Sequence, residues 1–253
     1  GSALLGVQFV RRQQRLAQPF IDLSLFRLPV FSAALSINLL SLFVAMGFFL
    51  FVAQYLQLVL GMGPLEAGLW TAPSGLLFAA GSLVAPQLVR RWAVSTVIAA
   101  SLVVTAAGFL LLAQQQPPFW LFMAGFLAMC AGLAPLGTLS TDLVLGTAPP
   151  ERAGAASAIS ETSFELGGAL GIAVMGSLVN ALYLAAVGPG MPDTLAGALA
   201  AANRLEADTG ATLLAAARQA YAGAMATAAL VGALLTLVAA AAAAVLLRAR
   251  QPY

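Results

Sequence analysis

The stretch that decides the fold runs from Val30 to Leu60 and reads VFSAALSINLLSLFVAMGFFLFVAQYLQLVL. It contains no Asp, Glu, Lys or Arg over its whole length. A bilayer core of about 30 Å requires roughly 20 apolar residues per helix, so this stretch is long enough to cross one. We therefore expect a membrane-spanning helix at residues 30–60.

Five more apolar stretches follow, separated by prolines, glycines or arginines of the kind that end helices. The six predicted spans are residues 30–60, 65–89, 93–114, 118–147, 153–187 and 217–247. Residues 29–250 are thus predicted to form a six-transmembrane-helix bundle, the fold of an all-α membrane protein. The long connection at about 188–215 is predicted to be an external loop that contains a short helix from Leu195 to Ala202.

Composition supports a membrane protein and excludes several kinds of chemistry. Hydrophobic residues make up 61% of the chain and charged residues 8%, against about 25% charged residues in a soluble domain. The chain has no histidine and no lysine, which removes His-based metal sites, His general bases and Lys Schiff bases. Cys130 is the single cysteine, so an internal disulfide is impossible. We expect no metal, no cofactor and no nucleic-acid partner.

The arginines predict the orientation in the membrane. If the first span starts in the cytoplasm, nine arginines lie on the cytoplasmic side and two on the other. The nine are Arg11, Arg12, Arg15, Arg27, Arg90, Arg91, Arg152, Arg248 and Arg250, and the two are Arg204 and Arg218. This positive-inside bias predicts a multi-pass plasma membrane protein (a bacterial inner membrane protein) with both termini in the cytoplasm. Residues 1–28 are predicted to hold the end of a preceding helix and a cytoplasmic interfacial segment.

Three acids inside the spans are the main candidates for function. An ionisable group in a membrane helix costs a few kcal/mol and usually faces a cavity, and Asp142, Glu161 and Glu165 are such groups. Glu161 and Glu165 are four residues apart and share a helical face, so one of the two carboxylates should hold a proton tightly. We expect these acids to couple protons or bind a cation. The alternative is a structural role, such as hydrogen bonds to neighbouring helices or, for Asp142, a polar patch that bends its helix.

Other polar, aromatic and small residues are weaker candidates. Asn38, Gln54, Tyr55 and Trp70 could line a polar cavity, although Tyr55 could equally lie at the membrane interface and Trp70 could face lipid. Gly167 and Gly171 form a small-xxx-small pair, which allows two helix backbones to approach closely. We interpret that pair as a helix-packing motif.

Several of these residues stand in motifs of a known family. Residues 148–158 (APPERAGAASA), then Glu161 and residues 166–171 (LGGALG), resemble the C-terminal half of the fourteen-helix drug:proton antiporters of the major facilitator superfamily, of the EmrB/QacA type and especially its SmvA-like members. Residues 20–27 (FIDLSLFR), 54–57 (QYLQ) and 64–69 (PLEAGL) are also similar to that family. The resemblance implies the C-terminal half of a major-facilitator fold, in which Glu161 and Glu165 take part in proton coupling or cation binding.

The function implied by the resemblance is export of small lipophilic or quaternary ammonium cations against an inward flow of protons. Its partners would be membrane lipid, the cation and the missing N-terminal six-helix half. A different class, a non-transporting membrane scaffold or accessory subunit, is the alternative, but a scaffold would not need three acids within its spans. An intramembrane enzyme is disfavoured because the sequence has no histidine, no Gly-x-Ser-x-Gly and no paired catalytic aspartates.

Overall fold

The computed structural model describes residues 7–8, 11–12 and 24–247. Its long helices are α2 (Pro29–Gln54), α3 (Pro64–Val89), α4 (Val94–Leu112), α5 (Phe119–Thr147), α6 (Ala153–Val187) and α8 (Ala207–Leu246). Shorter helical segments are η1 (Leu25–Arg27), η2 (Tyr55–Val59), η3 (Pro150–Arg152) and α7 (Leu195–Ala202). The described residues contain no strand, and all six long helices are long and apolar enough to cross a membrane. The predicted all-α six-helix fold is confirmed.

Proline and glycine set most of the helix boundaries. Pro29 and Pro64 each stand in the first turn of a helix, where the missing N–H has no intrahelical acceptor to lose. Gly188 ends α6 with φ 75°, a conformation that costs glycine little. Thr194 caps α7, because its hydroxyl accepts a hydrogen bond of 3.0 Å from the backbone N–H of Gly197.

The last part of the predicted external loop at about 188–215 is helical. Helix α8 begins at Ala207, so the connection covers residues 188–206 and includes α7. Two features extend the helix: Asp208 stands in the first turn, where a negative charge is favourable, and Gly210 packs closely on α7. A Cβ at Gly210 would come within 2.5 Å of the Ala202 carbonyl oxygen. The first turns of α8 are thus supported by α7.

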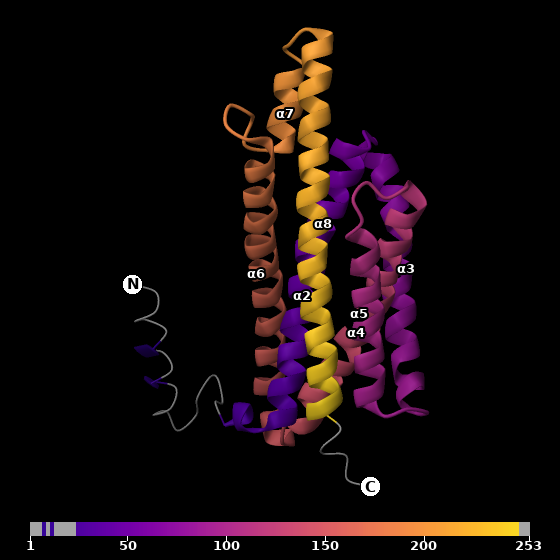
Figure 1. The fold of residues 1–253 in the computed structure, drawn as a ribbon. Helices are drawn as coiled ribbons and strands as arrows, with labels where there is room; N and C mark the ends of the chain where they lie inside the picture. Colours follow the sequence, from indigo (N-terminus) through magenta and orange to yellow (C-terminus); the bar gives the residue numbers. More distant parts are fainter. Residues whose placement is uncertain (1–6, 9–10, 13–23, 248–253) are drawn as a thin grey trace.

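The helices form a bundle in which α2 lies inside and α3 and α6 lie at the edges (Figure 1). Helix α2 packs against α5, α6 and α8, while α4 packs between α5 and α8. In the most apolar 18-residue stretch of each helix, 11% of the α3 residues and 22% of the α6 residues are buried, against 61% of the α5 residues. The two edge helices therefore present broad exposed faces.

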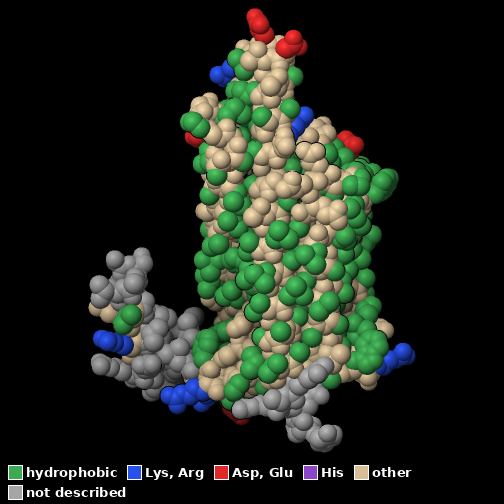
Figure 2. Space-filling model, in the orientation of Figure 1, with side chains coloured by type: hydrophobic (Ala, Val, Ile, Leu, Met, Phe, Trp, Pro, Cys, Tyr) green, Lys and Arg blue, Asp and Glu red, His purple; other side chains and the backbone are tan. Residues whose placement is uncertain are grey.

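On the face shown in Figure 2, charged side chains lie at the two ends of the bundle, and the band between them carries none. We call one end the arginine-rich end, because it carries Arg27, Arg90, Arg91 and Arg152. The opposite end, which we call the α7 end, carries Glu66, Asp193, Arg204, Glu206, Asp208 and Arg218. Arg15, Arg248, Arg250 and most of the segment 1–28 lie outside the described residues.

Candidate functional site

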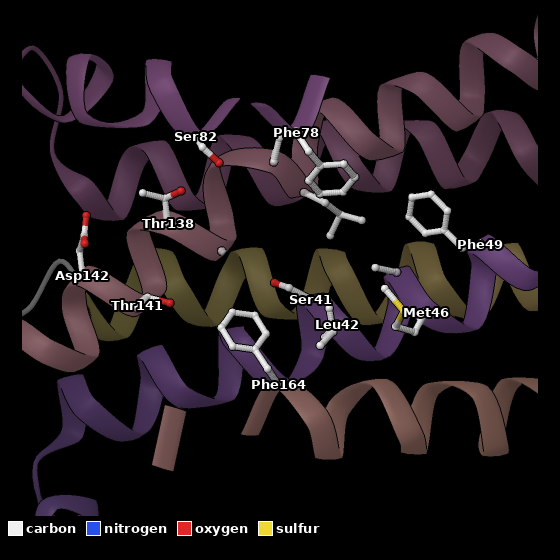
Figure 3. Close-up of a pocket in the computed structure, with 14 residues that line it drawn as sticks. Ser41, Leu42, Met46, Phe49, Phe78, Ser82, Thr138, Thr141, Asp142 and Phe164 are labelled. Carbon is white, nitrogen blue, oxygen red and sulfur yellow. The ribbon is translucent and has the colours of Figure 1, made fainter. Parts of the chain in front are cut away.

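A cavity of about 630 Å³ opens between four helices, and its volume lies within the range of small-molecule sites (Figure 3). Helices α4 and α8 contribute nothing to its wall, so they form the back of the bundle. The lining residues are Ser41, Leu42, Ala45, Met46 and Phe49 of α2, Phe78 and Ser82 of α3, Leu133, Ala134, Gly137, Thr138, Thr141 and Asp142 of α5, and Phe164 of α6. We call this the central cavity.

Close packing of α6 on α2 builds one wall of the central cavity. Gly167 and Gly171 face the backbone of α2, where a Cβ would overlap the carbonyl oxygens of Leu39 and Phe43. The hydroxyl of Ser163 on the same face donates to the Leu35 carbonyl oxygen at 3.2 Å. Because the two glycines have no side chains, the backbones of α6 and α2 can come into contact. This contact places Phe164 beside α2.

A buried polar network joins α2 to both α5 and α6. The Asn38 side chain is fully buried, and its Nδ2 donates to the Ser160 hydroxyl at 2.9 Å. Its Oδ1 accepts a hydrogen bond from the Ser140 hydroxyl. Interhelical hydrogen bonds of this kind favour one arrangement of helices in a membrane. Asn38, predicted as a cavity-lining candidate, therefore holds three helices together and is fully enclosed by them.

The wall of the central cavity is mostly apolar, with five polar side chains. Ser41, Ser82, Thr138 and Thr141 supply hydroxyls, and Asp142 supplies the one carboxylate of the lining, toward the arginine-rich end (Figure 3). Ser41 is 7% exposed, and its hydroxyl has no hydrogen-bond partner among the described residues. A buried hydroxyl without a partner carries a desolvation cost. Ser41 thus places an unpaired, buried hydroxyl at the wall of the cavity.

Two aromatic rings lie at the far side of the central cavity from Asp142, and a third lies between (Figure 3). Phe49 and Phe78 lie with centroids 6.2 Å apart, and Phe164 approaches Ser41 and Leu42 from α6 (Figure 3). Ring faces attract cations, more strongly where water is excluded. An apolar cavity with aromatic faces and a carboxylate at one end can hold a hydrophobic organic cation.

The two glutamates of α6 lie on the exposed part of that helix. Both are exposed, and the α6 residue that lines the central cavity is Phe164. At 3.6 residues per turn, Glu161 stands about 60° around the helix from Phe164, and Glu165 about 100°. The carboxylates therefore flank the central cavity, and within the described chain they do not form its lining.

The remaining predicted cavity residues lie at the α7 end. Tyr55 is buried and stacks on Phe122 with centroids 4.4 Å apart. Trp70 packs edge to face with Phe119 and Trp120. Gln54 Oε1 accepts a hydrogen bond from the Tyr221 hydroxyl at 2.9 Å and lines a different, smaller cavity. Tyr55 and Trp70 are thus part of aromatic packing away from the central cavity, because they stand near helix ends.

Sequence reasoning missed Ser41, Phe78 and Phe164, which the structure brings together with Asp142. Thr138 and Asp142 are four residues apart, a spacing that places two polar side chains on one helical face and could have indicated the α5 wall. No comparable signal marks Phe78 or Phe164 among the other phenylalanines. The described residues contain no group of three His, Cys, Asp or Glu side chains that could hold a metal ion.

Comparison with known proteins gives consistent results. Residues 7–172 match the Major Facilitator Superfamily. The multidrug efflux pump LfrA of Mycolicibacterium smegmatis is 36% identical over 248 residues, which cover 93% of this chain and 49% of LfrA. The methyl viologen resistance protein SmvA of Salmonella typhimurium is 34% identical over 194 residues, which cover 74% of this chain and 38% of SmvA.

A third relative, the tetracenomycin C resistance and export protein of Streptomyces glaucescens, is 30% identical over 173 residues, which cover 68% of this chain and 32% of the relative. The chain thus spans about half the length, or less, of the curated relatives that it matches. The family match covers most of the chain and agrees with the six-helix bundle and its central cavity. The chain belongs to the Major Facilitator Superfamily of membrane transporters.

Proposed function

We propose that this chain is the C-terminal half of a proton-coupled multidrug efflux transporter that exports lipophilic or quaternary ammonium cations. The central cavity is the observation that carries the proposal, since its aromatic wall and the Asp142 carboxylate suit a hydrophobic cation. Two relatives are named a multidrug efflux pump and a methyl viologen resistance protein, and these names support export of organic cations as the function.

The exposed faces beside the central cavity favour a second bundle as partner. Helix α3 exposes four leucines, each between 66% and 77% exposed: Leu65, Leu69, Leu76 and Leu83. Contact with lipid alone would be enough to accommodate these apolar side chains. Lipid would not tolerate the exposed carboxylates of Glu161 and Glu165 on α6, because each charge in hydrocarbon costs several kcal/mol. A partner that covers both edges, the N-terminal six-helix half, would close the central cavity and give the glutamates a polar environment.

The three acids then take different roles. Asp142 attracts the cation within the central cavity, since it is the carboxylate of the lining. Glu165 is deeper along α6 and carries the proton, while Glu161 tunes it and meets the substrate as it enters from the arginine-rich end. The proposed orientation puts that end in the cytoplasm, in agreement with the positive-inside rule.

Efflux measurements on the complete transporter test the proposal. In proteoliposomes driven by a proton gradient, Glu165→Gln should abolish pH-driven export, because the glutamine amide cannot release a proton. Glu161→Gln should weaken export of dicationic substrates more than of monocationic ones, because one attractive charge is lost. Both variants should leave membrane insertion unchanged, and in this chain alone in detergent they should leave the unfolding temperature unchanged, since neither side chain packs in this bundle.

A matched control uses Glu66, an exposed acid in the first turn of α3 at the α7 end. Glu66→Gln should retain the wild-type rate of export. Wild-type export by a Glu161→Gln, Glu165→Gln double variant would show that the two acids are structural and would refute the proposed mechanism.

A further inference from the structure

A second cavity of about 300 Å³ lies at the α7 end, between α2, α6 and α8. The first residues of α7 and the preceding Thr194 form its remaining wall. Gln54 of α2 and Leu58 of η2 line this second cavity, whereas residues 41–49 of α2 line the central cavity. The central cavity has walls from α3 and α5, and this one has none, so the two cavities lie on different sides of α2. We call the second one the lateral cavity.

The lateral cavity contains a buried hydroxyl with no partner. Tyr183 is 2% exposed, lines the lateral cavity and makes no hydrogen bond through its hydroxyl within the described residues. Gln54 and Tyr221 also line it and are joined by their 2.9 Å hydrogen bond. Because a buried hydroxyl is costly when unpaired, the Tyr183 O–H is suited to donate to an acceptor on a molecule in this cavity.

Opposite charges lie beside the lateral cavity. Arg218 stands three residues before Tyr221 on α8 and thus on the same helical face, and its Nε–H donates to the Leu58 carbonyl oxygen at 2.8 Å. Within the described part of the chain the guanidinium has no other hydrogen-bond partner, so its remaining N–H donors are available. Asp193 directly precedes Thr194, which lines the lateral cavity. A cation and an anion therefore flank a largely apolar cavity.

We expect the lateral cavity to lie near the level of the lipid esters, because α6 has 35 residues, about 52 Å of helix, and so extends beyond a hydrocarbon core of about 30 Å. Tyr183 lies four residues before the end of α6, about 6 Å along the helix axis. Leu50, which is 42% exposed, and Val179 line the part toward the middle of the bundle. In the first turn of α7 the backbone N–H groups of Leu195 and Ala196 stand at the wall without intrahelical acceptors, whereas the N–H of Gly197 is bonded to Thr194.

We propose that the lateral cavity binds one phospholipid with a zwitterionic ethanolamine headgroup from the leaflet at the α7 end. Arg218 and the first turn of α7 contact the phosphate, Asp193 contacts the ammonium group, and the Tyr183 hydroxyl donates to an ester oxygen. An acyl chain passes over Leu50 and Val179. This site depends on the membrane position of the bundle and not on which molecule the transporter exports.

Lipid retention tests the site directly. The chain is reconstituted in nanodiscs that contain equal amounts of phosphatidylethanolamine, phosphatidylglycerol and phosphatidylcholine, and the lipids that stay bound are counted by native mass spectrometry. One phosphatidylethanolamine per chain should be retained. Tyr183→Phe should weaken retention about tenfold, the effect of losing one good hydrogen bond, and Arg218→Gln should weaken it further.

Matched variants separate the site from general loss of structure. Tyr55→Phe removes the hydroxyl of another buried tyrosine at the same end, outside the lateral cavity, and Arg204→Gln removes the other arginine of the α7 end; both variants should retain the lipid. In lipid-free detergent, Tyr183→Phe should unfold at the wild-type temperature or higher, because it removes an unpaired polar group. Equal retention by Tyr183→Phe and wild type, loss with Tyr55→Phe, or retention of phosphatidylglycerol in place of phosphatidylethanolamine would each overturn the proposal.

Discussion

Ser41 and Ser95 are both buried serines whose hydroxyls lack a hydrogen-bond partner in the described part of the chain. Ser41 lines the central cavity, whereas Ser95 stands in the first turn of α4, behind it. Replacing either serine by alanine removes an unpaired hydroxyl and should leave the free energy of unfolding unchanged or higher. Only Ser41→Ala should change transport, raising the apparent KM for exported cations that accept hydrogen bonds about three- to tenfold.

The measurement is KM in the proton-driven efflux assay of the complete transporter, with Ser95→Ala as the control. A substrate without a hydrogen-bond acceptor should be exported by Ser41→Ala with an unchanged KM. If both serine variants shift KM equally, the Ser41 hydroxyl does not contact substrate.

Gly167 and Gly171 offer a second pair of tests at single residues. A methyl group at either position would overlap a carbonyl oxygen of α2, and backbone cannot move aside as a flexible side chain can. We expect Gly167→Ala and Gly171→Ala each to lower the free energy of unfolding in detergent by about 1 to 3 kcal/mol, the usual cost of overpacking. Gly176→Ala, on the same helix with nothing within 4 Å of its Cβ, should raise it or leave it unchanged. Equal effects at all three positions would mean that helix propensity, and not contact with α2, decides the result.

Helix α7 and the first turns of α8 pack directly on each other. Gly210 faces the Ala202 carbonyl oxygen, so Gly210→Val should separate α7 from α8 and speed hydrogen exchange of the α7 amides. Gly223→Val places the same β-branched residue in α8 where nothing lies within 4 Å, and it should leave α7 protected. Hydrogen exchange followed by mass spectrometry measures both. Unchanged exchange in α7 of Gly210→Val would show that this contact does not hold α7.

The sequence predicts the helices better than it predicts their faces. Apolar length and the prolines and glycines between spans gave all six long helices, and Leu195–Ala202 is a helix as expected. The start of α8 was missed because residues 207–216 are too polar for a span and are supported by α7. Phe78 and Phe164 could not be assigned to the central cavity, because lipid and bundle interior are equally apolar and the sequence period does not separate the two faces.

At the scale of the whole molecule, the environment of the three acids depends on what surrounds the bundle. Asp142 was predicted from its cost in hydrocarbon and does line a cavity. Glu161 and Glu165 were predicted by the same rule; they are exposed like Asp142, but they lie beside the cavity and not in its wall. A cost argument identifies residues that cannot face lipid, but it does not identify which neighbour provides the polar environment.

The distribution of arginines predicts how the whole bundle is oriented in the membrane. Arginines crowd one end, so the positive-inside rule places that end in the cytoplasm and the α7 end outside. Asp193→Cys at the α7 end should react with a membrane-impermeant maleimide in intact cells. Trp92→Cys, exposed at the arginine-rich end, should react only after the membrane is permeabilised. The native Cys130 is fully buried and should stay unlabelled under both conditions, so it needs no replacement. Choosing Trp92 keeps Arg90 and Arg91 in place, because removing an arginine could itself change the orientation. Labelling of both cysteines from the same side would refute a bundle whose two ends lie on opposite sides of the membrane, and labelling of Trp92→Cys alone in intact cells would reverse the orientation.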